Sequence, residues 1–349
     1  MFQTQSEVFL LPGSGRTALE AGALSVIEPG DRVLVIGAGQ FGVLMREIMN
    51  RVGADWTEFP VELGARLDLD RLAREAERLR PKAITLVHNE TSTGTTYPAA
   101  EVGRIARSVD ALYLLDTVSS IAGIDVRTDE WGVDLNMTGS QKCLAAPLGL
   151  AVVSVSPRAF ATMERRKRAA SSLVYDLLRW KDQWVPRLAR GQGARRIAAA
   201  PAGFDPDASH QRDARRDALD PGGRARRTAS GGTPSPARAV RRGVHAMGLE
   251  MFPDASIFSN TVSCVKTPKN VEPAAVVARM RDQYGILIGT GLDKMRTTTL
   301  RIGTMAMTAS PHYVLPTLSA LELTLRDLGH KCEPGAGVAA AQAAFADAV

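Results

Sequence analysis

The chain has 349 residues, of which 45% are hydrophobic, and its formal net charge is +6. This length allows one large domain and a smaller one, and the hydrophobic fraction excludes global disorder. Ten arginines fall between Arg187 and Arg227. The positive charge is therefore concentrated in one stretch and does not indicate a nucleic-acid partner.

The three cysteines, Cys143, Cys264 and Cys332, are far apart, and no CxxC pair occurs. This spacing argues against a disulfide framework and against a zinc site, so we expect a reducing compartment and no bound metal. No apolar run is long enough to span a bilayer, and the N-terminus lacks the basic and apolar regions of a signal peptide. The sequence predicts a cytoplasmic protein without a membrane partner.

Strands and helices alternate through the first half of the chain. Helical periodicity over residues 15–27 stops at a Pro-Gly turn, and the apolar run that follows indicates a buried strand. The same patterns predict strands at 6–13, 31–39, 83–90, 111–120, 134–142 and 149–156, and helices at 15–27, 41–54, 67–80 and 101–109. Strands separated by helices favour an α/β fold with a mainly parallel sheet and helices on both faces.

Residues 186–236 interrupt this alternation, since they contain only four large apolar side chains among many Arg, Ala, Pro, Gly and Asp residues. Two interpretations are open: a disordered insertion, or a GC-rich gene translated out of frame, which the composition favours. Regular patterns then resume, with a helix leading into a strand, a strand, a helix, a strand and a long helix, at 237–252, 260–267, 271–284, 298–305 and 312–329. We therefore predict a large domain at 1–185, an atypical segment at 186–236, a small C-terminal α+β domain at 237–330, and an Ala-rich, loosely docked tail at 331–349.

A glycine motif from Gly37 to Gly42 matches GxGxxG between a strand and a helix, and Glu58 lies downstream. This context is typical of a dinucleotide site, which would make the protein an NAD-dependent oxidoreductase. A glycine-rich turn of any doubly wound fold has the same appearance. Because the second half offers no evident acid–base residue for hydride transfer, we favour the second interpretation.

Four other features describe a different site. A glycine turn at 13–17 precedes the first helix, and the polar run 88–94 follows a strand. Asp116 ends the apolar run of the next strand, and Lys142 ends the strand after it. Pyridoxal 5'-phosphate (PLP) needs such a set: N–H groups for its phosphate, an acid for its ring nitrogen and a lysine amine for its aldehyde.

Five stretches carry a family resemblance: GSGRTALEA, HNETSTG, LLDTVSSIAGI, TGSQKCLAAPLGLAVVSVS and LRIGTM. The chain resembles the class V aminotransferases of fold type I, in the alanine/serine–glyoxylate group. The resemblance implies a large PLP-binding domain with a mainly parallel sheet, a small C-terminal domain, and a homodimer with active sites at its interface.

The resemblance also assigns roles to residues. Lys142 would bind the cofactor as a Schiff base, and Asp116 would pair with its pyridinium nitrogen. Arg301 would hold the substrate carboxylate, for which a planar guanidinium is suited, although a structural ion pair is the simpler explanation. The remaining cofactor contacts would come from Ser14, Gly15, Arg16 and Gln141 near the phosphate, Phe41 stacked on the ring, and Ser92 and Val118 along it.

The implied reaction is transamination from alanine or serine to glyoxylate or pyruvate. Ureidoglycine with glyoxylate and pyridoxamine with pyruvate are alternatives. Cysteine desulfurases share the fold but need a cysteine on a mobile loop, whereas Cys143 is expected in the core and Cys264 within a strand.

Two departures from the family pattern keep an inactive remnant open as a further alternative. The family begins earlier than Met1, so we expect a truncated N-terminus. The segment 186–236 stands where the family has a loop that reaches the partner's cofactor.

Overall fold

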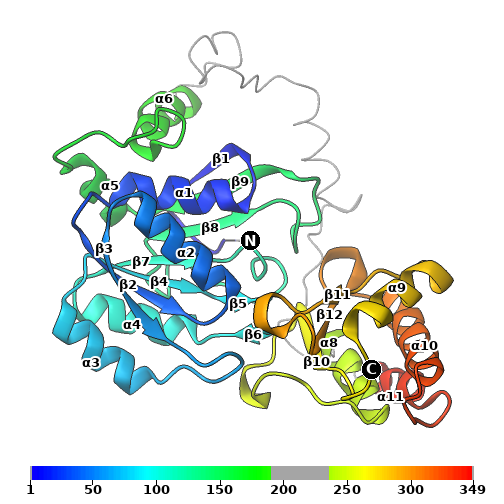
Figure 1. Cartoon of the computed structure of the whole chain (residues 1–349). Coiled ribbons are helices and arrows are strands. Elements are labelled where there is room, and N and C mark those ends of the chain that lie inside the picture. The colour runs from blue at the N-terminus through cyan, green and yellow to red at the C-terminus, as the bar shows by residue number, and fades with distance from the viewer. Residues whose placement is uncertain (1, 190–235, 348–349) are drawn as a thin grey trace.

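The computed structural model describes residues 2–189 and 236–347 (Figure 1). Almost all of the atypical segment lies outside the described residues, so both interpretations of it stay predictions. The boundaries of the domains predicted from sequence stay predictions as well.

A seven-stranded sheet forms the centre of the first part of the chain, in the order β1-β9-β8-β7-β4-β2-β3. The five strands from β8 to β3 are parallel, while β9 runs antiparallel to β8 and β1 antiparallel to β9. The mainly parallel α/β fold expected from the sequence is confirmed. The strands are β1 (Glu7–Gly13), β2 (Arg32–Gly37), β3 (Asp55–Pro60), β4 (Ala83–Val87), β7 (Leu112–Asp116), β8 (Leu135–Gly139) and β9 (Gly149–Val155).

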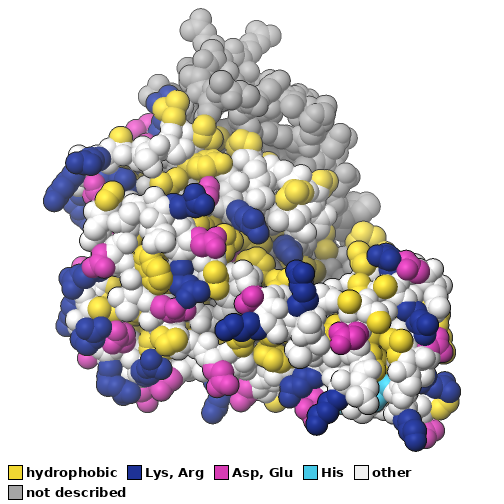
Figure 2. All heavy atoms as spheres, in the orientation of Figure 1, with side chains coloured by type: hydrophobic (Ala, Val, Ile, Leu, Met, Phe, Trp, Pro, Cys, Tyr) yellow, Lys and Arg dark blue, Asp and Glu magenta, His cyan; other side chains and the backbone are white. Residues whose placement is uncertain are grey.

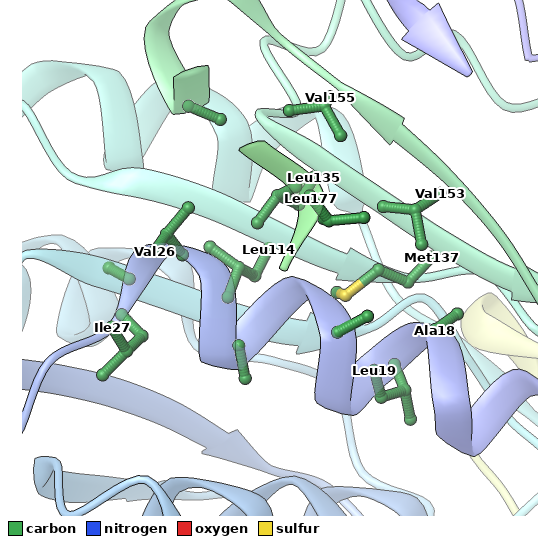
Figure 3. Close-up of a cluster of buried hydrophobic side chains, with 14 of the residues drawn as sticks. Ala18, Leu19, Val26, Ile27, Leu114, Leu135, Met137, Val153, Val155 and Leu177 are labelled. Carbon is green, nitrogen blue, oxygen red and sulfur yellow. The ribbon is translucent and has the colours of Figure 1, made fainter. Parts of the chain in front are cut away.

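Helices cover both faces of this sheet because successive side chains of its strands point to opposite sides. In β7, Leu112 and Leu114 belong to the core under α1 and α2, whereas Tyr113 and Leu115 belong to the core under α3 and α4. Figure 3 shows part of the first core, where side chains of α1 lie against those of three strands. The helices are α1 (Gly15–Val26), α2 (Gln40–Arg51), α3 (Leu69–Leu79), α4 (Ala99–Ser108), α5 (Pro157–Glu164) and α6 (Leu177–Ala189).

A smaller antiparallel sheet of order β10-β12-β11 lies in the C-terminal part. Its helices surround a separate hydrophobic core, to which Ala341 and Ala344 of α11 contribute buried side chains. The elements are α8 (Pro236–Ala246), β10 (Val262–Lys266), α9 (Pro273–Tyr284), β11 (Gly289–Thr290), β12 (Thr299–Gly303), α10 (Pro311–Asp327) and α11 (Ala336–Ala346), with short 3-10 turns at Ala255–Ile257, Asp293–Met295 and Ala306–Thr308.

The start of α11 is fixed by a buried carboxylate. Glu322 of α10 accepts hydrogen bonds from the N–H groups of Gly335 at 2.5 Å and Gly337 at 3.0 Å. An acid at a helix N-terminus accepts hydrogen bonds from the free N–H groups there, and its negative charge interacts favourably with the helix dipole. The Ala-rich tail is therefore held to α10 as well as packed on α8, so the expectation of a loosely docked tail is wrong.

Local expectations differ from the structure in several places, and α5, α6 and β11 were not expected from the sequence patterns. The edge strand β3 is missed by the sequence patterns because only Phe59 of its six residues is buried. The strand expected at the end of 237–252 is reduced to a single bridge between Met251 and Val265. A short hairpin was also not expected: β5 (Asn89–Glu90) lies in the polar run after β4, and its partner β6 (Thr95–Thr96) comes directly after that run.

Candidate active site

Asp116 and Lys142 lie at the carboxyl ends of two neighbouring parallel strands. Asp116 is the last residue of β7 and is buried, and Lys142 follows β8 and is half-buried. Burial raises the pKa of Asp116 to about 7, the Val118 N–H that donates to its Oδ1 at 2.8 Å lowers it, and the charges of Glu90 and Lys142 respectively raise and lower it. The lysine is thus within electrostatic reach of a buried acid, at the edge of the sheet where ligands bind in open α/β folds.

The N-terminus of α1 lies at the same edge. Gly13 has φ +144°, a conformation that favours glycine, and the Ser14 N–H donates to Thr17 Oγ1 at 3.1 Å. A Cβ on Gly15 would lie 2.6 Å from Val118 Cγ2, so the first turn of α1 touches the loop after Asp116. The structure therefore places Ser14 and Gly15 close to Val118.

Gln141 joins this group from the loop after β8. A Cβ on Gly139 would lie 2.6 Å from the Gly15 nitrogen and 2.7 Å from Gln141 Oε1. Arg16 is exposed in the first turn of α1. Free N–H groups at a helix N-terminus, with an arginine beside them, suit an anion such as a phosphate.

Phe41 and Ser92 are connected through Glu90, a carboxylate that sequence reasoning did not single out. Glu90 Oε2 accepts from the N–H groups of Phe41 at 3.0 Å and Gly42 at 3.3 Å. Its Oε1 accepts from the Ser92 N–H at 3.0 Å and hydroxyl at 2.5 Å, and Ser92 Oγ accepts from the Gln40 N–H at 3.1 Å. Burial raises the pKa of Glu90, and its hydrogen bonds oppose that shift.

These bonds argue against the dinucleotide alternative. The first N–H groups of α2, which a bound pyrophosphate would need, are already bonded to Glu90 and Ser92. Glu58, the proposed ribose-binding acid, forms an ion pair with Arg46 at 2.5 Å and packs beside Gly37, whose added Cβ would lie 2.1 Å from Glu58 Oε1. The glycine motif is a structural turn that carries Phe41.

Arg301 lies on β12 and faces the polar run after β4. Its Nε donates to the Thr290 carbonyl at 2.9 Å and its Nη1 to the Thr91 carbonyl at 3.3 Å. Burial lowers its pKa, whereas the charges of Cys264 and Glu90 raise it. Within residues 2–189 and 236–347 no carboxylate forms an ion pair with Arg301, so the simpler explanation of this arginine as a structural ion pair is not supported.

The polar run after β4 is itself buried, although it is rich in hydrogen-bonding side chains. Every residue from His88 to Thr95 is buried. The His88 N–H donates to the Asp116 carbonyl at 3.0 Å, and its ring packs edge-on against Trp131 with centroids 5.4 Å apart. Burial lowers the pKa of the His88 imidazole to about 4, so it is neutral at neutral pH. A long polar run directly after an apolar strand was the available signal for this cluster.

Two of the three cysteines, Cys143 and Cys264, are buried and poorly placed for nucleophilic chemistry, and the partly exposed Cys332 lies after α10. Burial raises the pKa of Cys143 to about 12 and that of Cys264 to about 11, and Cys264 lies within β10. Because the thiolate is the nucleophile, such thiols are unreactive. The geometry disfavours a cysteine desulfurase.

Comparison with known proteins agrees with this geometry. The aminotransferase class-V family matches residues 1–177. A serine–glyoxylate aminotransferase of Arabidopsis thaliana is 32% identical, over 98% of this chain and 83% of the relative. The chain belongs to the class-V aminotransferase family.

Two solved structures extend the likeness over almost the whole chain. The ureidoglycine–glyoxylate aminotransferase of Bacillus subtilis has a TM-score of 0.88 and 31% identity, covering 99% of this chain and 86% of its own. The pyridoxamine–pyruvate aminotransferase of Mesorhizobium loti has a TM-score of 0.85 and 28% identity, with the same coverage of both chains. This class-V protein has the type I fold of PLP-dependent transferases.

As a class-V member, the protein is a PLP-dependent transaminase. The donor set of this chain fits the cofactor. A buried acid lies at one strand end, a lysine with no ion pair among the described residues follows the next strand, and a helix N-terminus adjoins both. Among the same residues no group of three or more His, Cys, Asp or Glu could hold a metal ion. No described helix is long and apolar enough to cross a membrane.

Proposed function

We propose that this protein transfers an amino group from alanine or serine to glyoxylate or pyruvate. The observation that carries the proposal is the meeting of Lys142, Asp116 and the α1 N-terminus at one edge of the sheet, with Arg301 bonded to the adjoining Thr91 carbonyl. The names of the similar proteins support the acceptors, since they specify glyoxylate or pyruvate, both small 2-oxo acids.

Each end of the cofactor has a proposed partner in this chain. Lys142 Nζ would hold it covalently, and Asp116 would hold the proton on its ring nitrogen. The α1 N-terminus would hold its phosphate with help from Ser14, Gly15, Arg16 and Gln141. Phe41, Ser92 and Val118 would contact its ring. When bound, PLP supplies an electron sink for the bond that breaks at the donor's α-carbon.

The chain's own groups perform the remaining steps. Arg301 binds the carboxylate of the donor, and later that of the acceptor, because its planar fork matches two carboxylate oxygens. Lys142 Nζ would take the proton from the α-carbon of the donor and later deliver a proton to the α-carbon of the acceptor. Asp116 is ionised once a cationic ring nitrogen lies beside it, since an opposite charge favours the carboxylate.

A donor and acceptor screen tests this proposal. The protein, loaded with PLP, is incubated with alanine, serine, ureidoglycine or pyridoxamine and with either glyoxylate or pyruvate, and the amino products are measured. Alanine or serine with glyoxylate is expected to react fastest. Faster reaction of ureidoglycine or pyridoxamine would overturn the assignment of alanine or serine and identify that compound as the donor. A folded, PLP-loaded protein without activity would favour an inactive remnant.

We further propose that the protein is a cytoplasmic homodimer without a nucleic-acid partner. The resemblance to the family supports the homodimer. On the face shown in Figure 2, basic and acidic side chains are interspersed, which supports the absence of a nucleic-acid surface there. Sedimentation of the purified chain tests the homodimer, and a monomer at micromolar concentration would contradict it.

A further inference from the structure

Three side chains from different parts of the chain meet at one carbonyl oxygen. The Ser119 carbonyl accepts from Thr261 Oγ1 at 3.0 Å, Asn89 Nδ2 at 3.3 Å and Cys143 Sγ at 3.4 Å. Ser119 is three residues beyond Asp116, and Cys143 is the neighbour of Lys142. The loops that carry the acid and the lysine are thus joined to each other and to the C-terminal part of the chain.

Asn89 makes the largest number of these connections. Its Nδ2 also donates to Ser119 Oγ and Thr261 Oγ1, both at 2.9 Å. Its Oδ1 accepts from Ser259 Oγ at 2.6 Å and Thr96 Oγ1 at 2.8 Å. The side chain is 2% exposed, so its hydrogen-bonding capacity is used entirely within the protein. Removing it would take one hydrogen-bond partner from each of several polar groups at once.

The partners of Asn89 are connected to Arg301 through the pairing of β10 with β12. Ser259 Oγ accepts from the N–H groups of Thr261 at 3.0 Å and Val262 at 3.2 Å, and so fixes the start of β10. The Thr261 carbonyl accepts from the Thr304 N–H at 2.8 Å, just beyond β12. β10 and β12 are paired, and Cys264 lies opposite Arg301 in their register.

We propose that Asn89 is a positioning residue that sets the place of Arg301 relative to Asp116 and Lys142. The inference rests on the proposed function in one respect, namely that Arg301 binds the substrate carboxylate. The amide of Asn89 spans from the loop after Asp116 to the segment before β10. The distance between the substrate carboxylate site and the reacting amine therefore depends on this side chain.

Asn136 supplies a matched control. It is also fully buried, with Nδ2 donating to Thr128 Oγ1 at 2.8 Å and Oδ1 accepting from Thr117 Oγ1 at 2.5 Å. Both of its partners belong to the first part of the chain. Asn136→Ala removes a comparable buried amide without touching the connection to β10.

The first test uses hydrogen exchange and needs no activity. In Asn89→Ala, hydrogen exchange of the backbone amides from Ser259 to Val262 should accelerate by about tenfold. This factor corresponds to the net free energy that one buried hydrogen bond contributes to stability. Asn136→Ala should leave these amides unchanged. Equal exchange in both variants would overturn the connection itself.

The second test measures how well a carboxylate is positioned. PLP-loaded proteins are reacted with aminooxyacetate and with methoxyamine, which share the reacting group but differ in the carboxylate, and the ratio of the two rate constants is taken. Asn89→Ala should lower this ratio by about tenfold, and Arg301→Lys should lower it as well. Asn136→Ala should leave the ratio unchanged. Thr261→Val, which removes one hydroxyl at nearly constant shape, should lower it in the same direction and serves if Asn89→Ala does not fold.

The outcomes separate the two ideas. Faster exchange with an unchanged ratio would overturn the positioning role of Asn89. A ratio near one in the wild-type protein would instead refute the role of Arg301 in binding the carboxylate, and with it the positioning role of Asn89. The hydrogen-exchange result would still decide whether Asn89 joins the first part of the chain to the segment before β10.

Discussion

Replacing Asp116 by Asn should change how the stability of the cofactor-free protein depends on pH. Burial raises the pKa of Asp116 to about 7 from its ordinary value of 3.8. Between these values the folded state holds a proton that the unfolded state has released. The contribution of Asp116 to stability is therefore fully present below the lower pKa and is lost as pH rises to the higher one.

The size of the effect follows from the shift. Each pKa unit corresponds to about 1.4 kcal/mol, so the full shift of roughly three units represents about 4 kcal/mol. Between pH 5 and pH 8 the wild-type protein crosses about two of these units and should lose about 3 kcal/mol relative to Asp116→Asn. The asparagine stays neutral, and its Oδ1 can still accept from the Val118 N–H, a 2.8 Å bond in the native protein.

Urea denaturation of both cofactor-free proteins at pH 5, 6, 7 and 8 measures this difference. Glu90 and Asp134 also have a raised pKa, but both proteins contain them, so their contributions largely cancel. Asp116→Asn should be the more stable protein at pH 8, and PLP should stabilise it less than the wild type. A stability difference that stays constant from pH 5 to pH 8 would refute the reasoning.

Two further predictions concern the neighbours of this site. Glu90→Gln should weaken PLP binding by about tenfold in a fluorescence titration, because an amide has one acceptor oxygen and cannot accept from both the Phe41 and Gly42 N–H groups and the Ser92 groups. The control Glu58→Gln loses only an ion pair and should bind PLP with the affinity of the wild type. Equal affinities of the two variants would contradict the role of Glu90 in placing Phe41. Arg301→Lys should retain PLP but raise the KM for glyoxylate roughly 30-fold, equivalent to about 2 kcal/mol, because a single ammonium cannot form the bidentate contact with a carboxylate. Steady-state kinetics measure this change. An unchanged KM would show that another group binds the carboxylate.

Local patterns were sufficient for the main elements and for part of the site. The apolar run that ends at Asp116 and the alternating stretch that precedes Lys142 identify two strands, and the structure shows that these strands are parallel neighbours. The glycine turn before α1 was equally visible, because a positive φ at Gly13 requires glycine. The chemical roles of these residues stay predictions.

The functions of Asn89 and Glu90 could not be derived from local sequence. Both look like ordinary turn residues, and their importance comes from partners that are distant along the chain, such as Thr261 for Asn89 and Phe41 for Glu90. A single sequence without its fold does not show that a polar run is buried, which is the fact that gives each of these hydrogen bonds its weight. β3 was missed because it is a largely exposed edge strand, and such a strand has little apolar pattern.

The most direct test of the account is to locate the covalent cofactor. The protein is incubated with PLP, desalted, reduced with borohydride and digested, and the labelled peptide is identified by mass spectrometry. We expect a visible absorbance band before reduction and a label on Lys142; Lys142→Ala should lose both, while Lys266→Ala, at an exposed lysine of β10, should keep both. A label on another lysine, or a band retained in Lys142→Ala, would contradict the assignment of this site.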